Sequence, residues 1–424
     1  MSKIRLRLSV GAALLALVFT QASFSQEGRI GDHLEGLLKA AREGNPEVAS
    51  MQFEANAAAE RILPAGALPD PKFSMELRDI TRMGERNPTL LPGRVGSTRY
   101  IFTQELPWFG KRELKRAAAA LQAEAARGKL AGTWIELIGK IKTTYAQLYY
   151  LEQNERLTRE ILDLMARLEK VAQVRYSSGL AAQQDVIRAQ LEQTTMRNEL
   201  IALDAERSQL QAKLKALVGR PASETLATPE SIRTLPAPET MRFDVLEQRA
   251  RSSNPLLRTE ESQIQAAEKN RELTYKNRYP DFAVGLSPIQ YGKSVREWEL
   301  MVEVTIPLQQ ETRRAQELEA QAMLDAARSR REAATNQVLA DLYENLAGLE
   351  AARRTLALTT DSLLPQSELT FRSALAGYES GKVDFATLLD AQRQIRQAKL
   401  NQVKAGVAAQ MRLADIERIV GEDL

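Results

Sequence analysis

The chain has 424 residues, with 58 Lys and Arg, 55 Asp and Glu, and a formal net charge of +3. This balance gives no indication of a nucleic-acid partner. Cysteine is absent and histidine occurs once, which excludes disulfides, thiol nucleophiles and zinc sites built from Cys and His. One histidine near the N-terminus is also a poor general base, and the sequence has no glycine-rich phosphate loop. We therefore expect no enzyme, no cofactor and no metal site.

Residues 1–25 have the pattern of a secretory signal peptide. Three basic residues precede an apolar run and small residues follow it: Lys3, Arg5 and Arg7, then Leu8–Phe19, then Ala22, Ser23 and Ser25. A membrane anchor is the alternative interpretation, but the run is short for a helix that spans a bilayer. No later run reaches spanning length. We therefore expect an exported protein that is periplasmic, secreted or built into the outer membrane as strands.

The strongest signal in the sequence is an internal duplication. Several motifs recur in the same order in the two halves: Asn45-Pro46 and Asn254-Pro255, Tyr176–Gly179 and Tyr378–Gly381, Val218-Gly219 and Val420-Gly421. Such self-similarity predicts two copies of one structural unit. We place the first repeat at 26–220, a linker with four prolines at 221–238, and the second repeat at 239–424.

Each repeat is predicted to contain a helix, two strands, a long helix, a turn and a returning helix. In the first repeat no proline interrupts 111–176, and apolar residues alternate spacings of four and three: Leu157, Ile161, Leu164, Leu168 and Val171. That period of 3.5 residues is typical of a coiled coil. At 1.5 Å per residue, about 65 residues form a rod of roughly 100 Å. In the second repeat, Pro365 is expected to kink or break the long helix.

We predict four strands, two in each repeat, at Lys72–Arg78, Thr98–Leu106, Phe282–Ser287 and Glu297–Ile306. The last of them alternates, with Trp298, Leu300, Val302, Val304 and Ile306 on one face and Glu297, Glu299, Met301, Glu303 and Thr305 on the other. Strands of about 10 residues cross a bilayer when tilted. Four strands cannot close a barrel, which takes about eight, and open edges are not tolerated in lipid. If these strands span a membrane, several copies must pool them; a small soluble sheet is the alternative.

The duplication, the paired strands, the long helices and the glycine-containing turns together resemble the outer-membrane efflux protein family, the TolC-like channels. Two kinds of stretch are more specific. Gln104–Arg112, QELPWFGKR, is similar to the strand-to-helix segment of the branch associated with heavy-metal export. Tyr176–Asp185 and Tyr378–Asp390 are similar to the helical-hairpin tips at the periplasmic entrance of the family.

The resemblance implies a mainly α fold with a small β part, assembled as a homotrimer. Four strands from each chain would form one 12-stranded barrel in outer-membrane lipid, and the helices a tunnel through the periplasm. The family works as a passive conduit with a periplasmic adaptor and an inner-membrane pump. The QELPWFGKR segment favours heavy-metal cations as the exported solute.

The resemblance also assigns residues to three sites. The adaptor-docking tips would be Ser178, Gly179 and Leu180 in the first hairpin and Ser380, Gly381 and Lys382 in the second. The entrance gate would include Asp185, Tyr378 and Asp390. From the strand pattern, we expect Glu297, Glu299 and Glu303 to line the pore. One departure concerns the latch of drug-exporting members, in which an acid bonds a tyrosine and an arginine: the arginine position is Val383 here.

Two other interpretations belong to different classes of protein. A periplasmic adaptor is also exported and also uses a long helical hairpin, but it normally has one hairpin between compact β domains. A soluble coiled-coil scaffold would explain the helices but not the strands with one apolar face. Membrane fractionation separates the channel, which requires detergent, from both alternatives.

Overall fold

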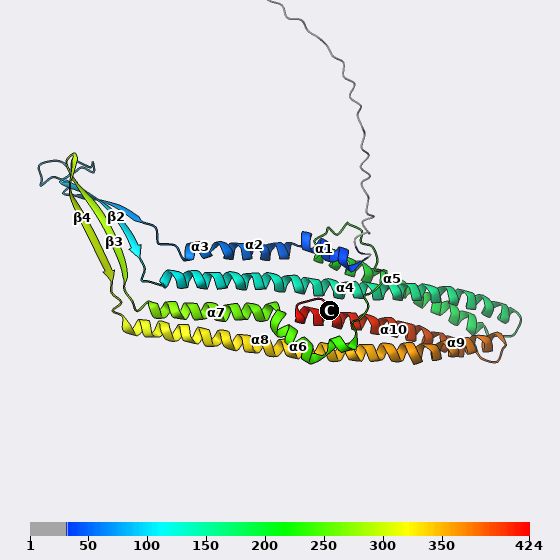
Figure 1. The fold of residues 1–424 in the computed structure, drawn as a ribbon. Helices are drawn as coiled ribbons and strands as arrows, with labels where there is room; N and C mark the ends of the chain where they lie inside the picture. Colours follow the sequence, from blue (N-terminus) through cyan, green and yellow to red (C-terminus); the bar gives the residue numbers. More distant parts are fainter. Residues whose placement is uncertain (1–30, 32) are drawn as a thin grey trace, which may run out of the picture.

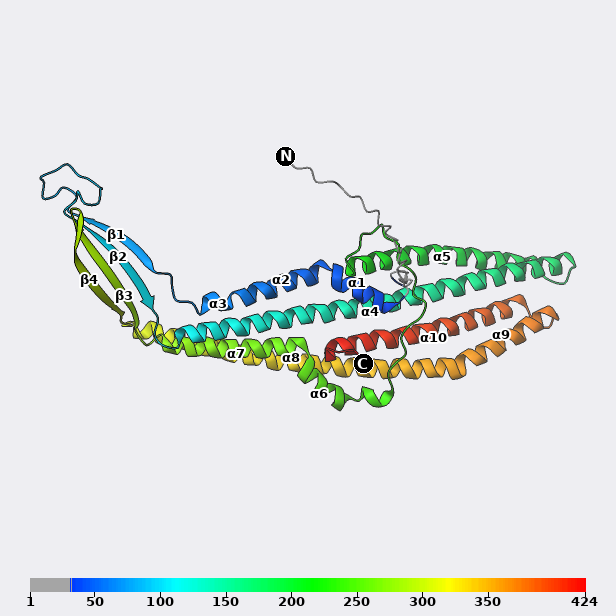
Figure 2. The ribbon, with the colours of Figure 1, turned by 45° about the horizontal axis from the view of Figure 1, so that its top comes forward.

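The computed structural model describes residue 31 and residues 33–424. The expected signal peptide at 1–25 lies outside the described residues. Figures 1 and 2 show a long helical body with a small β-sheet at one end, inclined to the helix axes. Of the helices in the described part, none is both long and apolar enough to cross a membrane.

The two halves of the chain contain corresponding elements in the same order. The first half contains α1 (Leu34–Gly44), α2 (Pro46–Glu60), α3 (Ile62–Ala65), β1 (Lys72–Arg78), β2 (Ser97–Leu106), α4 (Lys111–Ser177) and α5 (Gln183–Leu217). The second contains a 3₁₀ turn (Pro238–Met241), α6 (Phe243–Ser253), α7 (Pro255–Lys276), β3 (Asp281–Tyr291), β4 (Ser294–Thr305), α8 (Gln310–Leu358), a π-helical turn (Thr359–Leu363), α9 (Leu364–Glu379) and α10 (Phe385–Val420). The helix α4 alone has 67 residues, which at 1.5 Å per residue is about 100 Å.

The coiled-coil seam of α4 packs against the second half of the chain. Leu157, Ile161 and Leu168 are buried in one cluster with residues of α5, α9 and α10, among them Phe385. Burial of these side chains provides the hydrophobic free energy that joins the two hairpins along this part of the body. Val171 was expected to continue the seam, but it is 38% exposed. The neighbouring Ala172 is fully buried instead, so the buried position shifts by one residue after Leu168.

The repeated Asn-Pro motif ties each returning helix to the start of another helix. The Asn45 side chain accepts hydrogen bonds from two N–H groups in the first turn of α2 and donates one, of 2.8 Å, to the carbonyl of Leu217. Asn254 does the same at α7 and donates one of 2.7 Å to the carbonyl of Ile419. One side chain therefore satisfies unpaired groups at two helix ends.

Pro365 interrupts the long helix as expected: α8 ends at Leu358, a π-helical turn precedes the proline, and α9 begins at Leu364. One predicted strand boundary is wrong. The strand β3 does not end at Ser287 but continues through Pro288 to Tyr291, and β4 begins at Ser294. The β2–β3 pairing is interrupted opposite Ser287 and Pro288, so the missing N–H of the proline costs no hydrogen bond there.

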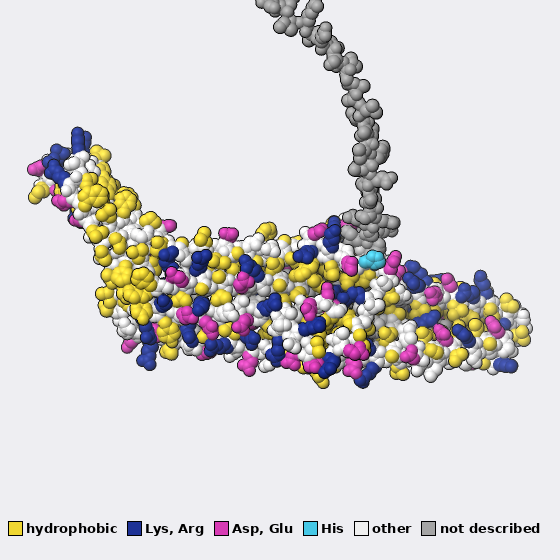
Figure 3. All heavy atoms as spheres, viewed as in Figure 1, with side chains coloured by type: hydrophobic (Ala, Val, Ile, Leu, Met, Phe, Trp, Pro, Cys, Tyr) yellow, Lys and Arg dark blue, Asp and Glu magenta, His cyan; other side chains and the backbone are white. Residues whose placement is uncertain are grey.

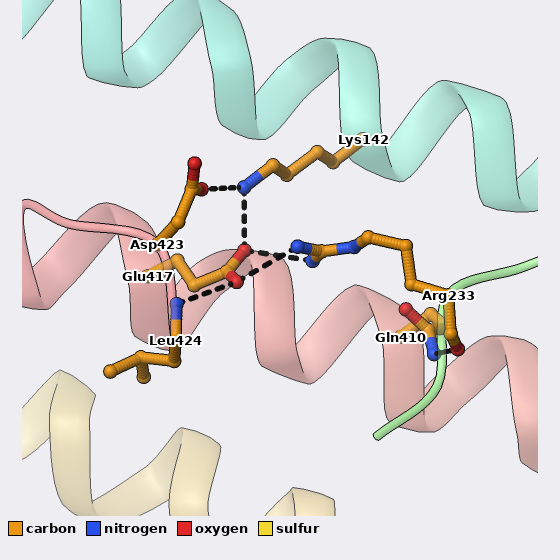
Figure 4. A network of polar contacts seen from close by, with 6 residues as sticks. All are labelled: Lys142, Arg233, Gln410, Glu417, Asp423 and Leu424. Atoms are coloured by element: carbon orange, nitrogen blue, oxygen red, sulfur yellow. Dashed lines mark hydrogen bonds and ion pairs between the residues drawn. The ribbon is translucent and has the colours of Figure 1, made fainter. Parts of the chain in front are cut away.

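A buried ion-pair network joins α4, the linker and α10, as Figure 4 shows. The Lys142 ammonium lies 2.7 Å from the Glu417 carboxylate, and both side chains are less than 5% exposed. Arg233 donates two hydrogen bonds to the same carboxylate, at 3.0 and 2.9 Å. Lys142 also pairs with Asp423. The carboxylate of Glu417 is thus the common partner of two cations from the first repeat and the linker.

We predict that Glu417→Gln destabilises the packing of α10, because it leaves Arg233 without a charged partner and Lys142 with Asp423 alone. Breaking a buried pair of this kind costs about 3 kcal/mol, which corresponds to roughly hundredfold faster amide exchange where α10 opens locally. The matched control is Glu350→Gln, which removes an exposed pair with Arg354 on α8 and should cost less than about 0.5 kcal/mol. For each variant, hydrogen exchange is measured in the last two turns of α10. Equal exchange rates there in the two variants would contradict the predicted role of Glu417.

Candidate functional site

The four strands form one antiparallel sheet in the order β1-β2-β3-β4, and one of its faces is apolar and exposed. On β4, Trp298, Leu300 and Val302 are each at least 64% exposed, and Ile306 just after it is also exposed. Neighbouring strands add exposed apolar residues to the same face: Phe73, Met75, Phe102, Val284 and Leu286. In Figure 3 this surface is a continuous yellow band over the sheet. Such a large exposed apolar patch indicates contact with lipid or with another protein.

The opposite face of the sheet carries charged side chains, including the three glutamates of the predicted pore lining. Glu299 lies 2.6 Å from the Arg99 guanidinium on β2. Glu297 accepts a hydrogen bond of 3.2 Å from the Tyr291 hydroxyl. Among the described residues, no ion pair or hydrogen bond engages the carboxylate of Glu303. The alternation predicted for β4 is therefore present, but Glu299 is already neutralised by a partner from the other repeat.

Both hairpin tips at the far end of the body reverse through the same backbone geometry. Gly179 and Gly381 have φ of +70° and +75°, in the left-handed region. In the first tip, Leu180 donates its N–H to the carbonyl of Arg175 at 2.8 Å; in the second, Lys382 donates to the carbonyl of Gly377 at 2.8 Å. These 6→1 bonds are the Schellman arrangement that satisfies helix-end carbonyls. The tip segments Ser178–Leu180 and Ser380–Lys382 therefore have matching structures.

An arginine of the first tip binds the second tip. The Arg175 guanidinium donates to the backbone carbonyls of Tyr378 and Glu379, at 2.8 and 3.1 Å. It also stacks on the Tyr378 ring, 5.0 Å from the ring centroid. A cation at the C-terminus of α9 is favoured by the helix dipole. We call this set of contacts the Arg175 clamp.

Comparison with known proteins identifies the fold and the family. The family model for "Outer membrane efflux protein" matches residues 37–220 and 246–422, most of the chain. The chain belongs to the outer membrane efflux protein family. Family membership shows an outer-membrane efflux channel whose helices extend into the periplasm. It does not favour the two alternatives, an adaptor or a soluble scaffold.

Individual relatives cover nearly the whole chain. The cobalt-zinc-cadmium resistance protein CzcC of Cupriavidus metallidurans is 24% identical over 400 residues, covering 92% of this chain and 90% of the relative. The pyoverdine export outer membrane protein OpmQ of Pseudomonas putida is 23% identical over 405 residues, covering 88% and 84%. The solved structures of the outer-membrane channel OprN and of the transmembrane channel CusC align with TM-scores of 0.77 and 0.78 at 20% and 15% identity, each covering 93% of both chains. The fold is that of these channels, with a helical tunnel and strands contributed to a barrel.

The latch of drug-exporting members of the efflux family is not formed within one chain. The Tyr378 hydroxyl is buried and has no hydrogen-bond partner in the part of the chain that the structure describes. Burial, and then the Asp185 carboxylate, raise the pKa of Tyr378. Burial raises the pKa of Asp185 as well, opposed by Arg188 and reinforced by Asp384. A raised carboxyl pKa means that the ionised form is disfavoured in the folded tip, so Asp185 costs stability as the pH rises through its pKa and costs none at lower pH.

Position 383, where the latch of drug-exporting members has an arginine, is a valine that cannot form an ion pair. Val383 instead packs against Gly377, where a Cβ would lie 2.6 Å from its methyl group. Asp390, the third predicted gate residue, is exposed on α10 and lies 3.6 Å from Arg393 of the same helix. The Arg175 clamp was not predicted from the sequence, because Arg175 and Tyr378 are neighbours only after the two hairpins pack together.

The QELPWFGKR segment is the joint between β2 and α4, and its side chains bind the second repeat. The Trp108 ring stacks on Tyr279 with centroids 5.1 Å apart, and the Trp108 backbone N–H donates to the Asp281 carboxylate at 2.7 Å. The Lys111 ammonium is buried and pairs with the same carboxylate at 2.8 Å. These contacts therefore hold the connection between β2 and α4 of the first repeat against the start of β3 in the second repeat. No group of three potential metal ligands occurs among residues 33–424.

The two tip glycines provide a matched test of the Arg175 clamp. We predict that Gly179→Ala and Gly381→Ala each cost about 1–2 kcal/mol locally, because alanine resists a positive φ. A Cβ at Gly179 meets open space, whereas one at Gly381 lies 3.2 Å from the Arg175 guanidinium. Hydrogen exchange should therefore show that Gly381→Ala also exposes the last turn of α4, where Arg175 lies, and that Gly179→Ala leaves the end of α9 unchanged. Effects confined to the substituted tip in both variants would mean that the clamp does not couple the tips.

Proposed function

We propose that three copies of this chain form the outer-membrane channel of a tripartite efflux system that exports heavy-metal cations. The observation that carries the proposal is the open sheet with one apolar face. The outer edges of β1 and β4 have no partner strand in the described chain, and unpaired backbone groups cost several kcal/mol each in lipid. Strands from further copies satisfy these edges, and three copies supply 12 strands, above the roughly eight that a barrel needs.

The charged face of the sheet is then the pore lining. With the apolar face toward outer-membrane lipid, alternation directs Glu297, Glu299 and Glu303 to the water-filled interior. Because Arg99 pairs with Glu299, Glu297 and Glu303 supply the carboxylates that have no ion pair in the described chain, and rings of acids favour cations in a pore. Conduction requires binding that is weak enough for release. Separate carboxylates satisfy this requirement better than a chelating cluster.

The hairpin tips are the surface proposed for the periplasmic adaptor. Ser178, Leu180, Ser380 and Lys382 are exposed at the end of the body opposite the sheet, and the two glycines between them set the reversal. Asp185, Tyr378 and Asp390 lie on the same part of the hairpins and are the proposed entrance gate. The adaptor connects this end to an inner-membrane pump, which supplies the energy. The chain itself catalyses no reaction in this proposal.

The substrate proposal rests on the similarity to CzcC, a cobalt-zinc-cadmium resistance protein, and on the QELPWFGKR segment. Deleting the gene for this chain should increase the cobalt, zinc and cadmium retained by the cells several-fold, measured by elemental mass spectrometry. Complementation with the parent should restore export, and complementation with Glu297→Gln/Glu303→Gln should restore less. The matched control is Glu230→Gln/Glu332→Gln, which removes two exposed glutamates of the linker and of α8. Unchanged metal retention after deletion would exclude these cations as substrates.

A further inference from the structure

The sheet ends in two connections on the side away from the helical body. Figure 1 shows both of them there: the segment 79–96 between β1 and β2, and the turn around Gly292 between β3 and β4. Because the helices extend into the periplasm, these connections face the cell exterior. The 12 residues of β4 span about 40 Å at roughly 3.3 Å each. A tilted strand of that length crosses a hydrocarbon core of about 30 Å, which places the connections at the outer headgroup level.

These connections carry four basic and two acidic residues, and a fifth basic residue, Arg296, lies near the start of β4. Arg82 lies 3.8 Å from Glu85, and Asp79 accepts a hydrogen bond of 2.8 Å from the backbone N–H of Met83. The other four cations are exposed, and no ion pair to them occurs within the described chain; they are Arg86, Arg94, Lys293 and Arg296. Figure 3 shows dark blue side chains gathered at this end, beside the apolar band. We call these four residues the distal basic surface.

A close backbone contact combines the two connections into one surface. A Cβ at Gly93 would lie 2.6 Å from the carbonyl oxygen of Gly292, so only glycine permits this approach. Arg94 and Lys293 directly follow the two touching glycines. The longer connection is also held by its own backbone bonds, including one of 2.9 Å from the Gly96 N–H to the Asp79 carbonyl. The four cations therefore lie in or next to connections whose backbones are held together by direct contacts.

Apolar side chains lie among the cations of this surface. Met83, Leu90 and Leu91 of the longer connection are 92%, 75% and 55% exposed, and Trp298 lies at the adjoining end of the apolar face. Exposed apolar groups interspersed with unpaired cations suit the boundary between acyl chains and charged headgroups. A freely soluble anion would use the cations alone.

We propose that the distal basic surface binds the phosphate groups of phosphorylated lipids in the outer leaflet. Each basic residue near an anionic membrane surface contributes to such binding, and the contribution falls off within the Debye length. The lipid thereby seals the rim of the barrel and fixes its height in the membrane. The inference rests on the outer-membrane placement of the channel but not on the identity of the exported solute.

The test uses the full detergent-solubilised assembly and native mass spectrometry, which also counts its chains. The probe is diphosphorylated lipid A, compared with the dephosphorylated lipid and with inorganic phosphate as a competitor. The variant Arg86→Gln/Arg94→Gln/Lys293→Gln/Arg296→Gln should bind the diphosphorylated lipid about tenfold more weakly or worse. The matched control Lys170→Gln/Arg197→Gln/Lys213→Gln/Lys404→Gln removes four exposed cations of the helical body and should bind like the parent.

Several results would overturn the proposal: equal binding by the quadruple variant and the parent, equal binding of the dephosphorylated lipid, or an equal loss in the control. Displacement of the lipid by millimolar inorganic phosphate would indicate an ion site instead and would also overturn it. If the quadruple variant fails to assemble, binding by the parent at rising ionic strength decides, since screening should weaken it. Metal retention in cells is measured separately, so failure of lipid binding and failure of the proposed export are distinguishable.

Discussion

The whole structure depends on one constraint: a backbone placed in lipid must have all its hydrogen bonds satisfied. A sheet of four strands cannot meet that requirement by itself, because the outer edges of β1 and β4 remain open. The apolar face from Trp298 to Ile306 is equally unsuited to water. Pooling strands between copies resolves both problems at once. The helical body then has to be arranged around the same axis, which makes a tunnel the natural continuation of the barrel.

Contacts between the two repeats determine how the halves of the chain fit together. At the sheet end, Trp108 and Lys111 of the first repeat bind Asp281 of the second. In the middle of the helical body, Glu417 forms ion pairs with Lys142 and Arg233. At the tips, Arg175 donates to carbonyls at the end of α9. All three contacts are polar or charged and lie at different positions along a mainly apolar interface. They therefore determine how the two halves align along the helix axis, and they bury little additional apolar surface.

The Arg175 clamp joins the two tips at the proposed entrance. Where the drug-exporting members of the family use an arginine of the second tip, this chain has Val383, and its clamp joins the two hairpins of one chain. The unsatisfied Tyr378 hydroxyl and the half-buried Asp185 remain outside the clamp. Because the clamp joins the two tips of one chain, we expect the two hairpins of a chain to move together.

Periodicity and duplication made much of this fold predictable. The alternation from Glu297 to Ile306 placed the correct residues on the two faces of β4, and the repeated glycines marked both reversals. The continuation of β3 through Pro288 was missed, because its tolerance depends on a gap in the pairing with β2. The neutralisation of Glu299 by Arg99 was also missed, since it requires the register between strands of different repeats. The contacts between the tips depend on residues far apart in the sequence, so local periodicity does not predict them. The domain limits at 26–220 and 239–424 stay predictions.

The proposed channel requires one face of β4 to contact lipid and the other to contact water, and a chain without cysteine allows this to be tested by cysteine labelling. Single cysteines introduced at Glu297, Glu299 and Glu303, and at Leu300, Val302 and Val304, would be exposed to a charged maleimide in outer-membrane vesicles. We expect rapid labelling at the three glutamate positions and protection at the three apolar positions. Labelling that does not alternate along the strand, or that reverses the two sets, would contradict this arrangement.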